Sequence, residues 1–163
     1  KSKEAVLNVL DSGWLVQGKE VRKFENEWAN ISNSKFAICV NSCTSALYLS
    51  LKALGLKKNE GVILPSFTWI STANVVEQLG GKPIFCDIDL NTYNIDIEEL
   101  EKKITKKVKY ILPVHLFGLP CDMDKILAIS KKYNLKIVED AACAIGSKYK
   151  NRSSNLQHSN CIR

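Results

Sequence analysis

The sequence predicts an α/β domain built on a largely parallel sheet with helices on both faces. Apolar runs of strand length alternate with longer segments in which apolar residues recur at helical spacing. Parallel strands need crossover connections of this kind, and the helices that supply them cover the two faces of the sheet. The chain has 163 residues, 45% of them hydrophobic, which is enough to bury the core of one ordinary domain.

The N-terminal part of the chain is predicted to be helical. Apolar residues recur at helical spacing from Lys3 to Leu10, and the polar stretch 11–13 ends this helix. A loop containing an exposed Trp14 leads to a second helix, at residues 20–31. The side chains expected to be buried on this second helix are Val21, Phe24, Trp28 and Ile31.

The remainder of the chain alternates between strands and helices. The predicted strands cover residues 36–40, 61–64, 82–86, 110–114 and 136–138. The predicted helices cover residues 46–54, 68–79, 97–104 and 123–133. From Lys148 to Arg163 the sequence is polar and follows neither period, so an irregular tail is expected there.

Charge and cysteine usage argue against a nucleic-acid site, disulfide bonds and a metal site. The net charge of +6 comes mostly from lysine pairs on predicted helices and turns, interleaved with glutamates, which favours a solvated surface over a nucleic-acid site. The six cysteines form no Cys-x-x-Cys pair, and neither His115 nor His158 has metal-ligand spacing to them. We therefore expect reduced thiols, a cytoplasmic protein and no metal. No apolar run is long enough to cross a membrane.

Asp140 is the first candidate site residue, because it directly follows the last predicted strand. Open α/β sheets bind ligands at the carboxyl ends of their strands, so an acid at this position is a candidate for holding a cofactor. The alternative is a helix cap, since Asp is favoured before a helix and Ala141, Ala142 and Ala144 suit one.

Ser42 to Ser45 form a second candidate site between a predicted strand and a predicted helix. Hydroxyl groups and backbone N–H groups at a helix start suit a phosphate, and the same residues are ordinary capping residues. No glycine-rich dinucleotide or nucleoside-triphosphate motif is present.

Two further candidates follow the next two strands. Trp69 could stack on a flat cofactor ring or simply pack in a core. Asp87 and Asp89 could hold a divalent metal in a nucleotide-sugar glycosyltransferase, but Asn91 and Asn94 continue the chemistry of a turn and favour that interpretation.

Taken together, these stretches resemble a known family. The residues that carry the resemblance are Gly13-Trp14, Gly18, Phe24-Glu25, 40–47, 64–69, Asp87 to Asp89, 113–118, Asp122 to Asp124 and 138–142. In this order they resemble the DegT/DnrJ/StrS family of sugar aminotransferases, over roughly residues 1–150. Members are pyridoxal-phosphate enzymes of the aspartate-aminotransferase fold type, with a three-layer α/β/α large domain, and most aminate keto-sugars carried on nucleotides.

The resemblance implies roles for individual residues. Asp140 would pair with the protonated pyridine nitrogen of pyridoxal 5'-phosphate, and Trp69 would stack on its ring. Thr44, with Cys43 and Ser45 beside it, would hold the phosphate. Cys143 stands where many members carry Gln or His near the ring hydroxyl, and Cys43 stands where Gly is common.

The resemblance also implies that part of the enzyme lies outside the chain. The family's Schiff-base lysine would follow residue 163, so no catalytic residue is assigned, and Lys148 and Lys150 come too early to replace it. Residues 1–150 would be the N-terminal part of the cofactor-binding domain, residues 151–163 a divergent tail, and the small C-terminal domain would be absent. We therefore expect an inactive fragment that binds the cofactor weakly or not at all.

The expected parent activity is transfer of an amino group, from glutamate, to a nucleotide-linked keto-sugar in a homodimer. Three alternatives stay open. One is a dehydratase of the same family that uses pyridoxamine phosphate, one is the metal-dependent glycosyltransferase using Asp87 and Asp89, and the last is a non-catalytic vestigial module.

Overall fold

The computed structural model of the protein describes residues 1–150, 152–153 and 161–162. The chain divides into two compact units, Lys1–Cys39 and Val40–Arg163. The boundary falls ahead of the cofactor-site candidates, so all six of these residues belong to the second unit.

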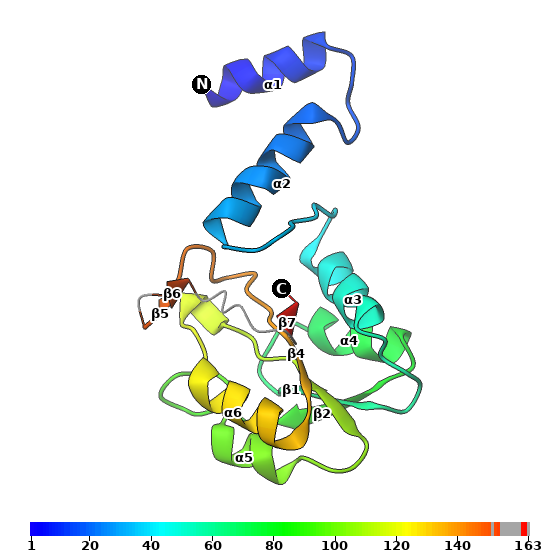
Figure 1. The fold of residues 1–163 in the computed structure, drawn as a ribbon, viewed down its shortest axis with the longest axis vertical. Coiled ribbons are helices and arrows are strands. Elements are labelled where there is room, and N and C mark those ends of the chain that lie inside the picture. Colours follow the sequence, from blue (N-terminus) through cyan, green and yellow to red (C-terminus); the bar gives the residue numbers. More distant parts are fainter. Residues whose placement is uncertain (151, 154–160, 163) are drawn as a thin grey trace. The chain divides into compact units, whose positions relative to one another are not determined.

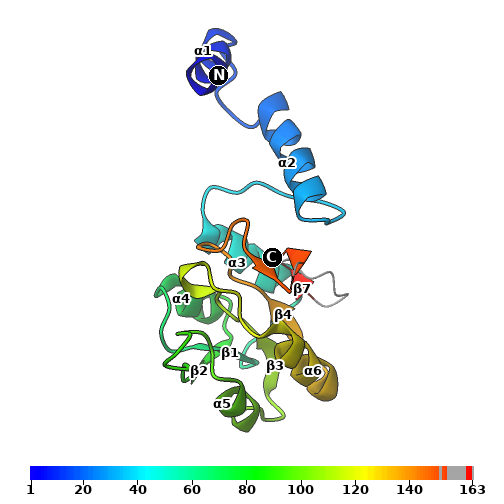
Figure 2. The same cartoon turned by 90° about the vertical axis from the view of Figure 1, so that its left-hand side faces the viewer.

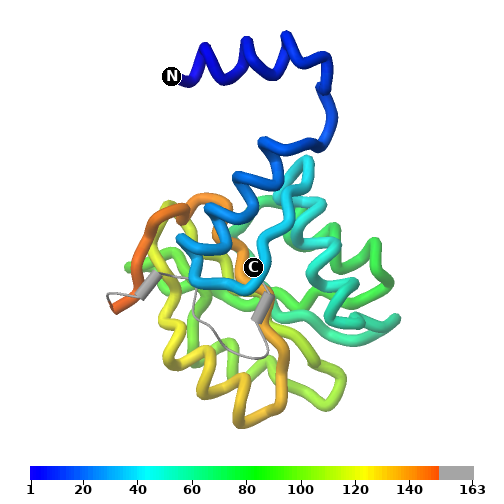
Figure 3. The backbone as a smooth tube through the Cα atoms, turned by 45° about the horizontal axis from the view of Figure 1, so that its top comes forward, coloured from blue at the N-terminus to red at the C-terminus, as the bar shows by residue number. Residues whose placement is uncertain are grey.

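The first unit consists of two helices, α1 (Ser2–Asp11) and α2 (Lys19–Ile31). They are joined by a loop (Figure 3). In this loop the indole N–H of Trp14 donates to the Gln17 carbonyl at 3.0 Å. The helices form where predicted, but neither buries a side chain. The expected burial of Val21, Phe24, Trp28 and Ile31 is wrong: the first and third are half-buried, and the other two are exposed. Within this unit, two helices offer no further layer to cover an apolar stripe.

The predicted strand at residues 36–40 does not form. Its backbone is irregular, and Phe36 and Ile38 remain 75% and 81% exposed. A strand needs a neighbouring strand for its N–H and C=O groups, and here the Cys39 N–H donates instead to the Glu25 carboxylate at 2.7 Å. An apolar run of strand length was therefore not sufficient to form a strand at residues 36–40.

The second unit contains the predicted parallel sheet (Figure 1). Its strand order is β2-β1-β3-β4-β7, and Figure 2 labels all five strands. All neighbouring strands in this sheet pair in parallel. The strands are β1 (Gly61–Pro65), β2 (Lys82–Cys86), β3 (Val108–Ile111), β4 (Lys136–Val138) and β7 (Cys161–Ile162). A separate antiparallel pair is formed by β5 (Lys148–Tyr149) and β6 (Arg152–Ser153).

Helices cover both faces of this sheet, which confirms the three-layer α/β/α arrangement. Figures 1 and 2 show α3 (Cys43–Ala53) and α4 (Ser71–Gln78) on one face, with α5 (Ile97–Lys102) and α6 (Met123–Tyr133) on the other. Successive residues of β1 point to opposite faces, as the pleat requires. Val62 and Leu64 pack with Leu51 and Val76 under α3 and α4. Ile63 packs with the cluster under α5 and α6, whose other members include Leu100, Ile126 and Ile137.

Several boundaries differ from the predicted ones. Strand β3 ends at Ile111 rather than at Val114, and α4 begins at Ser71 rather than at Thr68. A short 3-10 turn, η1 (Leu116–Gly118), follows β3. The strands β5, β6 and β7 lie in the polar stretch for which no element was predicted, and the rest of that stretch lies outside the described residues.

The cysteines of the described residues differ in burial, and Cys86 and Cys121 are the buried ones. Within the described part of the chain, Cys39, Cys43, Cys86, Cys121 and Cys143 are all free. Burial raises the pKa of Cys86 and of Cys121 to about 12 in each case, so both thiols stay protonated at neutral pH. No helix in the described ranges is both long enough and apolar enough to cross a bilayer.

Two leucines of α3 offer a matched test of the core under this helix. Leu51 is fully buried, whereas Leu49 on the same helix is 48% exposed. We expect Leu51→Ala to lower the free energy of unfolding by about 2–5 kcal/mol, the usual cost of a buried Leu-to-Ala truncation. Leu49→Ala should change it by no more than about 0.5 kcal/mol. Urea denaturation followed by circular dichroism measures both, and equal effects would contradict this packing.

Candidate functional site

Asp140 lies directly beyond β4, at the carboxyl edge of the sheet. Its backbone continues the parallel pairing, because its N–H donates to the Pro113 carbonyl at 2.9 Å and its carbonyl accepts from the His115 N–H at 3.0 Å. No helix follows, since residues 141–147 form turns. The helix-cap interpretation of Asp140 is therefore wrong, and the placement at the strand end is confirmed.

The Asp140 carboxylate is held by three hydrogen-bond donors although its residue is only 6% exposed. Oδ1 accepts from the Ala142 N–H at 3.1 Å and from the Cys43 thiol at 3.7 Å. Oδ2 accepts from the Thr72 hydroxyl at 3.4 Å. These donors come from three separate elements, which fixes the plane of the carboxylate.

The Cys43 thiol responds electrostatically to this carboxylate. Burial, followed by the charge of Asp140 and the hydrogen bond to it, raises the pKa of Cys43 to about 11. An electrostatic interaction with Cys143 adds to the shift, so the structure places the two predicted cysteines near each other. At neutral pH the Cys43 thiol is protonated and acts as a donor.

The phosphate candidates occupy the first turn of α3. Ser42 is the N-cap, and its hydroxyl accepts from the Ser45 N–H at 3.1 Å. The Ser45 hydroxyl in turn donates to the Asn41 side chain at 2.7 Å. Capping is therefore the structural role of Ser42, while Thr44 and the backbone of Cys43 lie at the positive end of the helix dipole.

Trp69 lies in the turn between β1 and α4, and its side chain is 76% exposed. Its carbonyl accepts from the Thr72 N–H at 3.0 Å, which ties it to the residue that contacts Asp140. The core-packing alternative for Trp69 is excluded by this exposure, and the ring is available to an aromatic partner.

Cys143 lies in the loop after β4, which packs closely on η1. Gly118 has φ +85°, and a Cβ there would lie 3.3 Å from the Cys143 carbonyl oxygen. The Ser147 hydroxyl donates to the Gly118 carbonyl at 2.7 Å. A side chain at position 118 would therefore be strained in the backbone and crowded against this loop.

A buried hydrogen bond between His115 and Glu139 connects the strand end to the loop after β3. His115 Nε2 lies 3.2 Å from Glu139 Oε2, and both side chains are almost completely buried. The Cys121 N–H donates to His115 Nδ1 at 3.1 Å, so the ring proton is on Nε2 and is donated to Glu139. Glu139 directly precedes Asp140, so this hydrogen bond holds the segment after β4 against the segment after β3.

The acids Asp87 and Asp89 behave as turn residues. Asp89 Oδ1 accepts from the N–H groups of Asn91 and Thr92 at 2.7 and 3.0 Å, and these bonds lower the pKa of Asp89. No group of three His, Cys, Asp or Glu side chains within the described ranges could hold a metal ion. The turn interpretation is thus confirmed.

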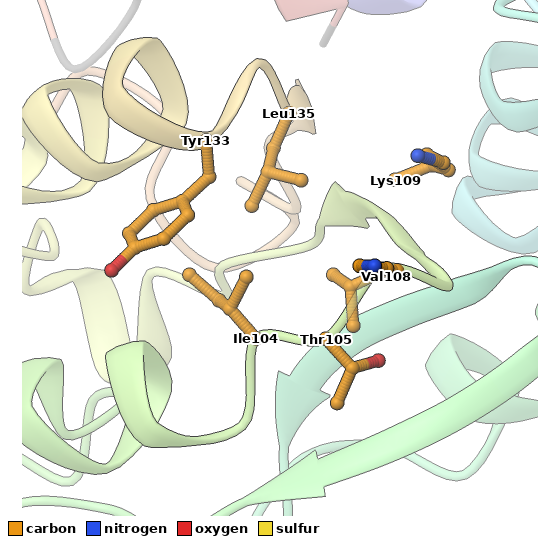
Figure 4. Close-up of a pocket in the computed structure, with 7 residues that line it drawn as sticks. Ile104, Thr105, Val108, Lys109, Tyr133 and Leu135 are labelled. Atoms are coloured by element: carbon orange, nitrogen blue, oxygen red, sulfur yellow. The ribbon is translucent and has the colours of Figure 1, made fainter.

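A hollow of about 410 Å³ lies at the other end of the sheet (Figure 4). Val108 begins β3 and Leu135 precedes β4, so the hollow is at the amino ends of these strands. Its lining contains none of the six predicted site residues, and it is separate from the Asp140 site.

Comparison with known proteins identifies the family. The sequence model of the DegT/DnrJ/EryC1/StrS aminotransferase family matches residues 1–159. The chain belongs to this family. Its fold is correspondingly that of the pyridoxal-phosphate-dependent aminotransferases of fold type I, and it is incomplete relative to the full-length structures.

Three relatives show how far the similarity extends. The spore coat polysaccharide biosynthesis protein SpsC of Bacillus subtilis is 46% identical over 91% of this chain and 38% of its own length. The structure of S. venezuelae DesV in complex with a ketimine intermediate has 38% identity and a TM-score of 0.90, covering 93% of this chain and 41% of that one. The E. coli GDP-4-keto-6-deoxy-D-mannose-3-dehydratase with bound hydrated PLP has 35% identity and a TM-score of 0.88, covering 92% and 40%. The chain therefore spans about two fifths of the relatives it matches.

Sequence reasoning missed Thr72, Thr68 and the His115–Glu139 pair. Thr72 lies inside a stretch predicted as ordinary helix, and nothing in its local pattern marks contact with a residue far along the chain. The motif around His115 carried part of the family resemblance, but its partner Glu139 looked like one half of an acidic pair. Only the parallel pairing of the two segments shows that these side chains meet.

The raised pKa of Cys43 leads to a test of its contact with Asp140. Asp140→Asn removes the negative charge, so the pKa of Cys43 should fall and its thiolate fraction at pH 9 should rise. We expect faster alkylation of Cys43 by iodoacetamide, measured by mass spectrometry of the peptide. Cys86, in strand β2, serves as the internal control, and an unchanged Cys43 rate would contradict the contact.

Proposed function

We propose that this chain forms the cofactor-binding part of a pyridoxal-phosphate-dependent aminotransferase that transfers an amino group, from glutamate, to a nucleotide-linked keto-sugar. Membership of the family supports the reaction class. The observation that carries the proposal is the Asp140 carboxylate, buried at the carboxyl edge of the sheet and held by Cys43, Thr72 and Ala142.

The donor set around Asp140 fits the pyridine ring of the cofactor. A carboxylate has about four acceptor positions, and the three hydrogen bonds to Asp140 leave Oδ2 with room for a further N–H. A carboxylate at this position is a suitable partner for a positively charged N–H group. Asp140 would in this way hold a proton on the ring nitrogen.

Other residues would bind and orient the cofactor. The exposed ring of Trp69 would pack on the face of the pyridine ring. The first turn of α3, with Thr44, Ser45 and the backbone of Cys43, would bind the phosphate at the positive end of the helix dipole. Cys143 would lie beside the ring hydroxyl. When bound, pyridoxal phosphate supplies an electron sink for bonds broken at the substrate carbon.

The site residues named above include no amine. Among the described residues no hydrogen bond joins a lysine to Asp140, and Lys150 is paired with Asp124. A covalent mechanism needs an amine that serves as both nucleophile and proton carrier. We therefore propose that the 163 residues by themselves bind the cofactor weakly and reversibly and do not catalyse transamination.

Binding and trapping of the cofactor test this proposal. We expect saturable binding of pyridoxal phosphate, followed by absorbance, with no stoichiometric adduct at a single lysine after borohydride reduction and peptide mass spectrometry. Asp140→Ala should weaken binding at least tenfold, because the ring nitrogen loses its charged partner. Thr105→Val, at the opposite end of the sheet, should leave binding unchanged. Stoichiometric trapping at one lysine, or equal binding by all three proteins, would contradict the proposal.

A dehydratase of the same family is the second candidate. The E. coli dehydratase with bound hydrated PLP matches this chain with a TM-score of 0.88, close to the value of 0.90 for DesV. The two reactions share the ring partner and the phosphate turn, so the part of the site present here does not separate them. The turn geometry of Asp89 does not support the glycosyltransferase alternative, and metal-ligand clusters of three His, Cys, Asp or Glu side chains do not occur among the described residues.

We further propose that the protein acts as a homodimer. Apolar side chains that a monomer would bury remain exposed in the second unit, among them Trp69, Leu90, Phe117 and Ile145. Exposed apolar side chains of this number favour association. Sedimentation analysis should show dimers or larger species, and a stable monomer would count against this state.

A further inference from the structure

Thr72 is a fully buried residue whose hydroxyl donates to Oδ2 of Asp140. It lies in the first turn of α4 and is 0% exposed. Its Oγ1 is 3.4 Å from Asp140 Oδ2 and 3.2 Å from the hydroxyl of Thr68, in the turn that precedes the helix. Two hydroxyl groups therefore stand in line behind the carboxylate.

The directions of these two hydrogen bonds follow from the chemistry of the acceptor. An ionised carboxylate only accepts, so the single hydroxyl hydrogen of Thr72 must point to Oδ2. Thr72 then has no hydrogen left for Thr68, and Thr68 must donate to the oxygen of Thr72. Hydrogen bonds aligned in one direction polarise each other, which strengthens the donor at Asp140.

The two oxygens of the Asp140 carboxylate accept different numbers of hydrogen bonds. Oδ1 receives both the Cys43 thiol and the Ala142 N–H, whereas Oδ2 receives only Thr72. The remaining acceptor position of Oδ2 is the one left for a ligand. Its direction depends on the rotation of the carboxylate, and Thr72 is the group that sets it from the Oδ2 side.

We propose that Thr72, supported by Thr68, is a positioning residue that aims Asp140 Oδ2 at the ring nitrogen of the bound cofactor. This inference rests on the proposed function, because it assumes that a protonated pyridine nitrogen faces Asp140. Thr72 touches neither cofactor nor substrate and acts only through the carboxylate. Its loss leaves the Asp140 carboxylate with two donors, both on Oδ1, and with no side-chain hydrogen bond that sets the direction of Oδ2.

A pair of ligands separates this role from a general loss of structure. Pyridoxamine 5'-phosphate carries the ring nitrogen, and its carbocyclic analogue has a C–H in that place. We expect Thr72→Val to weaken binding of pyridoxamine phosphate to the 163-residue chain about tenfold, the effect of one lost hydrogen bond to a charged group. Binding of the analogue should change less than twofold, since Asp140 makes no hydrogen bond to it. Fluorescence titration measures both affinities.

Two variants serve as controls for this titration. Thr72→Ser keeps the hydroxyl and should restore affinity for pyridoxamine phosphate to within twofold of the original protein. Thr105→Val, an exposed threonine at the other end of the sheet, should affect neither ligand. Equal weakening of both ligands by Thr72→Val, or failure of serine to rescue, overturns the positioning role.

A double-mutant cycle on unfolding tests the hydroxyl chain without any ligand. Thr72→Val should raise the unfolding equilibrium constant about tenfold in the original protein and much less in the Asp140→Ala background, because the partner is gone. If the effects of Thr72→Val and Asp140→Ala on unfolding are additive, the positioning role of Thr72 is overturned even if the cofactor binds. If the two effects are coupled but the chain binds neither ligand, the proposed cofactor site is overturned instead. The two failures are therefore distinguishable.

Discussion

The site depends on backbone hydrogen bonds that continue the parallel pairing of β3 and β4 past Val138, the last residue of β4. The Asp140 backbone bonds to Pro113 and His115, so the segment after β3 holds the acid at the sheet edge. The buried His115–Glu139 pair fixes the same two segments through their side chains. A helix or a flexible loop after β4 could not place the carboxylate within reach of both α3 and α4.

The Cys43 thiol contributes to this site as a neutral hydrogen-bond donor to Asp140. Its thiol gives Asp140 a weak donor, and its pKa is raised by burial and by the charge of the acid it contacts. A glycine would leave that side of the carboxylate open, so the thiol takes part in orienting Asp140. The protonated thiol adds no negative charge to a site proposed to bind an anionic phosphate.

Sequence reasoning succeeded where local pattern and tertiary context agree. The bounds of β2, α6 and β4 were predicted correctly, because each segment is closed by turn residues. Residues 36–40 have the same apolar character but find no partner strand, so pairing, which is not local, decided the outcome. Asp140 could be nominated from its place after a strand, whereas Thr72 contacts it across 68 positions of sequence and left no local signal.

Strand β2 is the last strand on its side of the sheet within the described residues, and its chemistry makes that edge a poor template. Pro83 has no N–H to offer, and the exposed Lys82 places a charge beside it. An incoming strand would find the hydrogen-bonding row interrupted. On the opposite side of the sheet, β4 pairs in parallel with β7. The edge at β2 is therefore protected against pairing with a strand from another molecule.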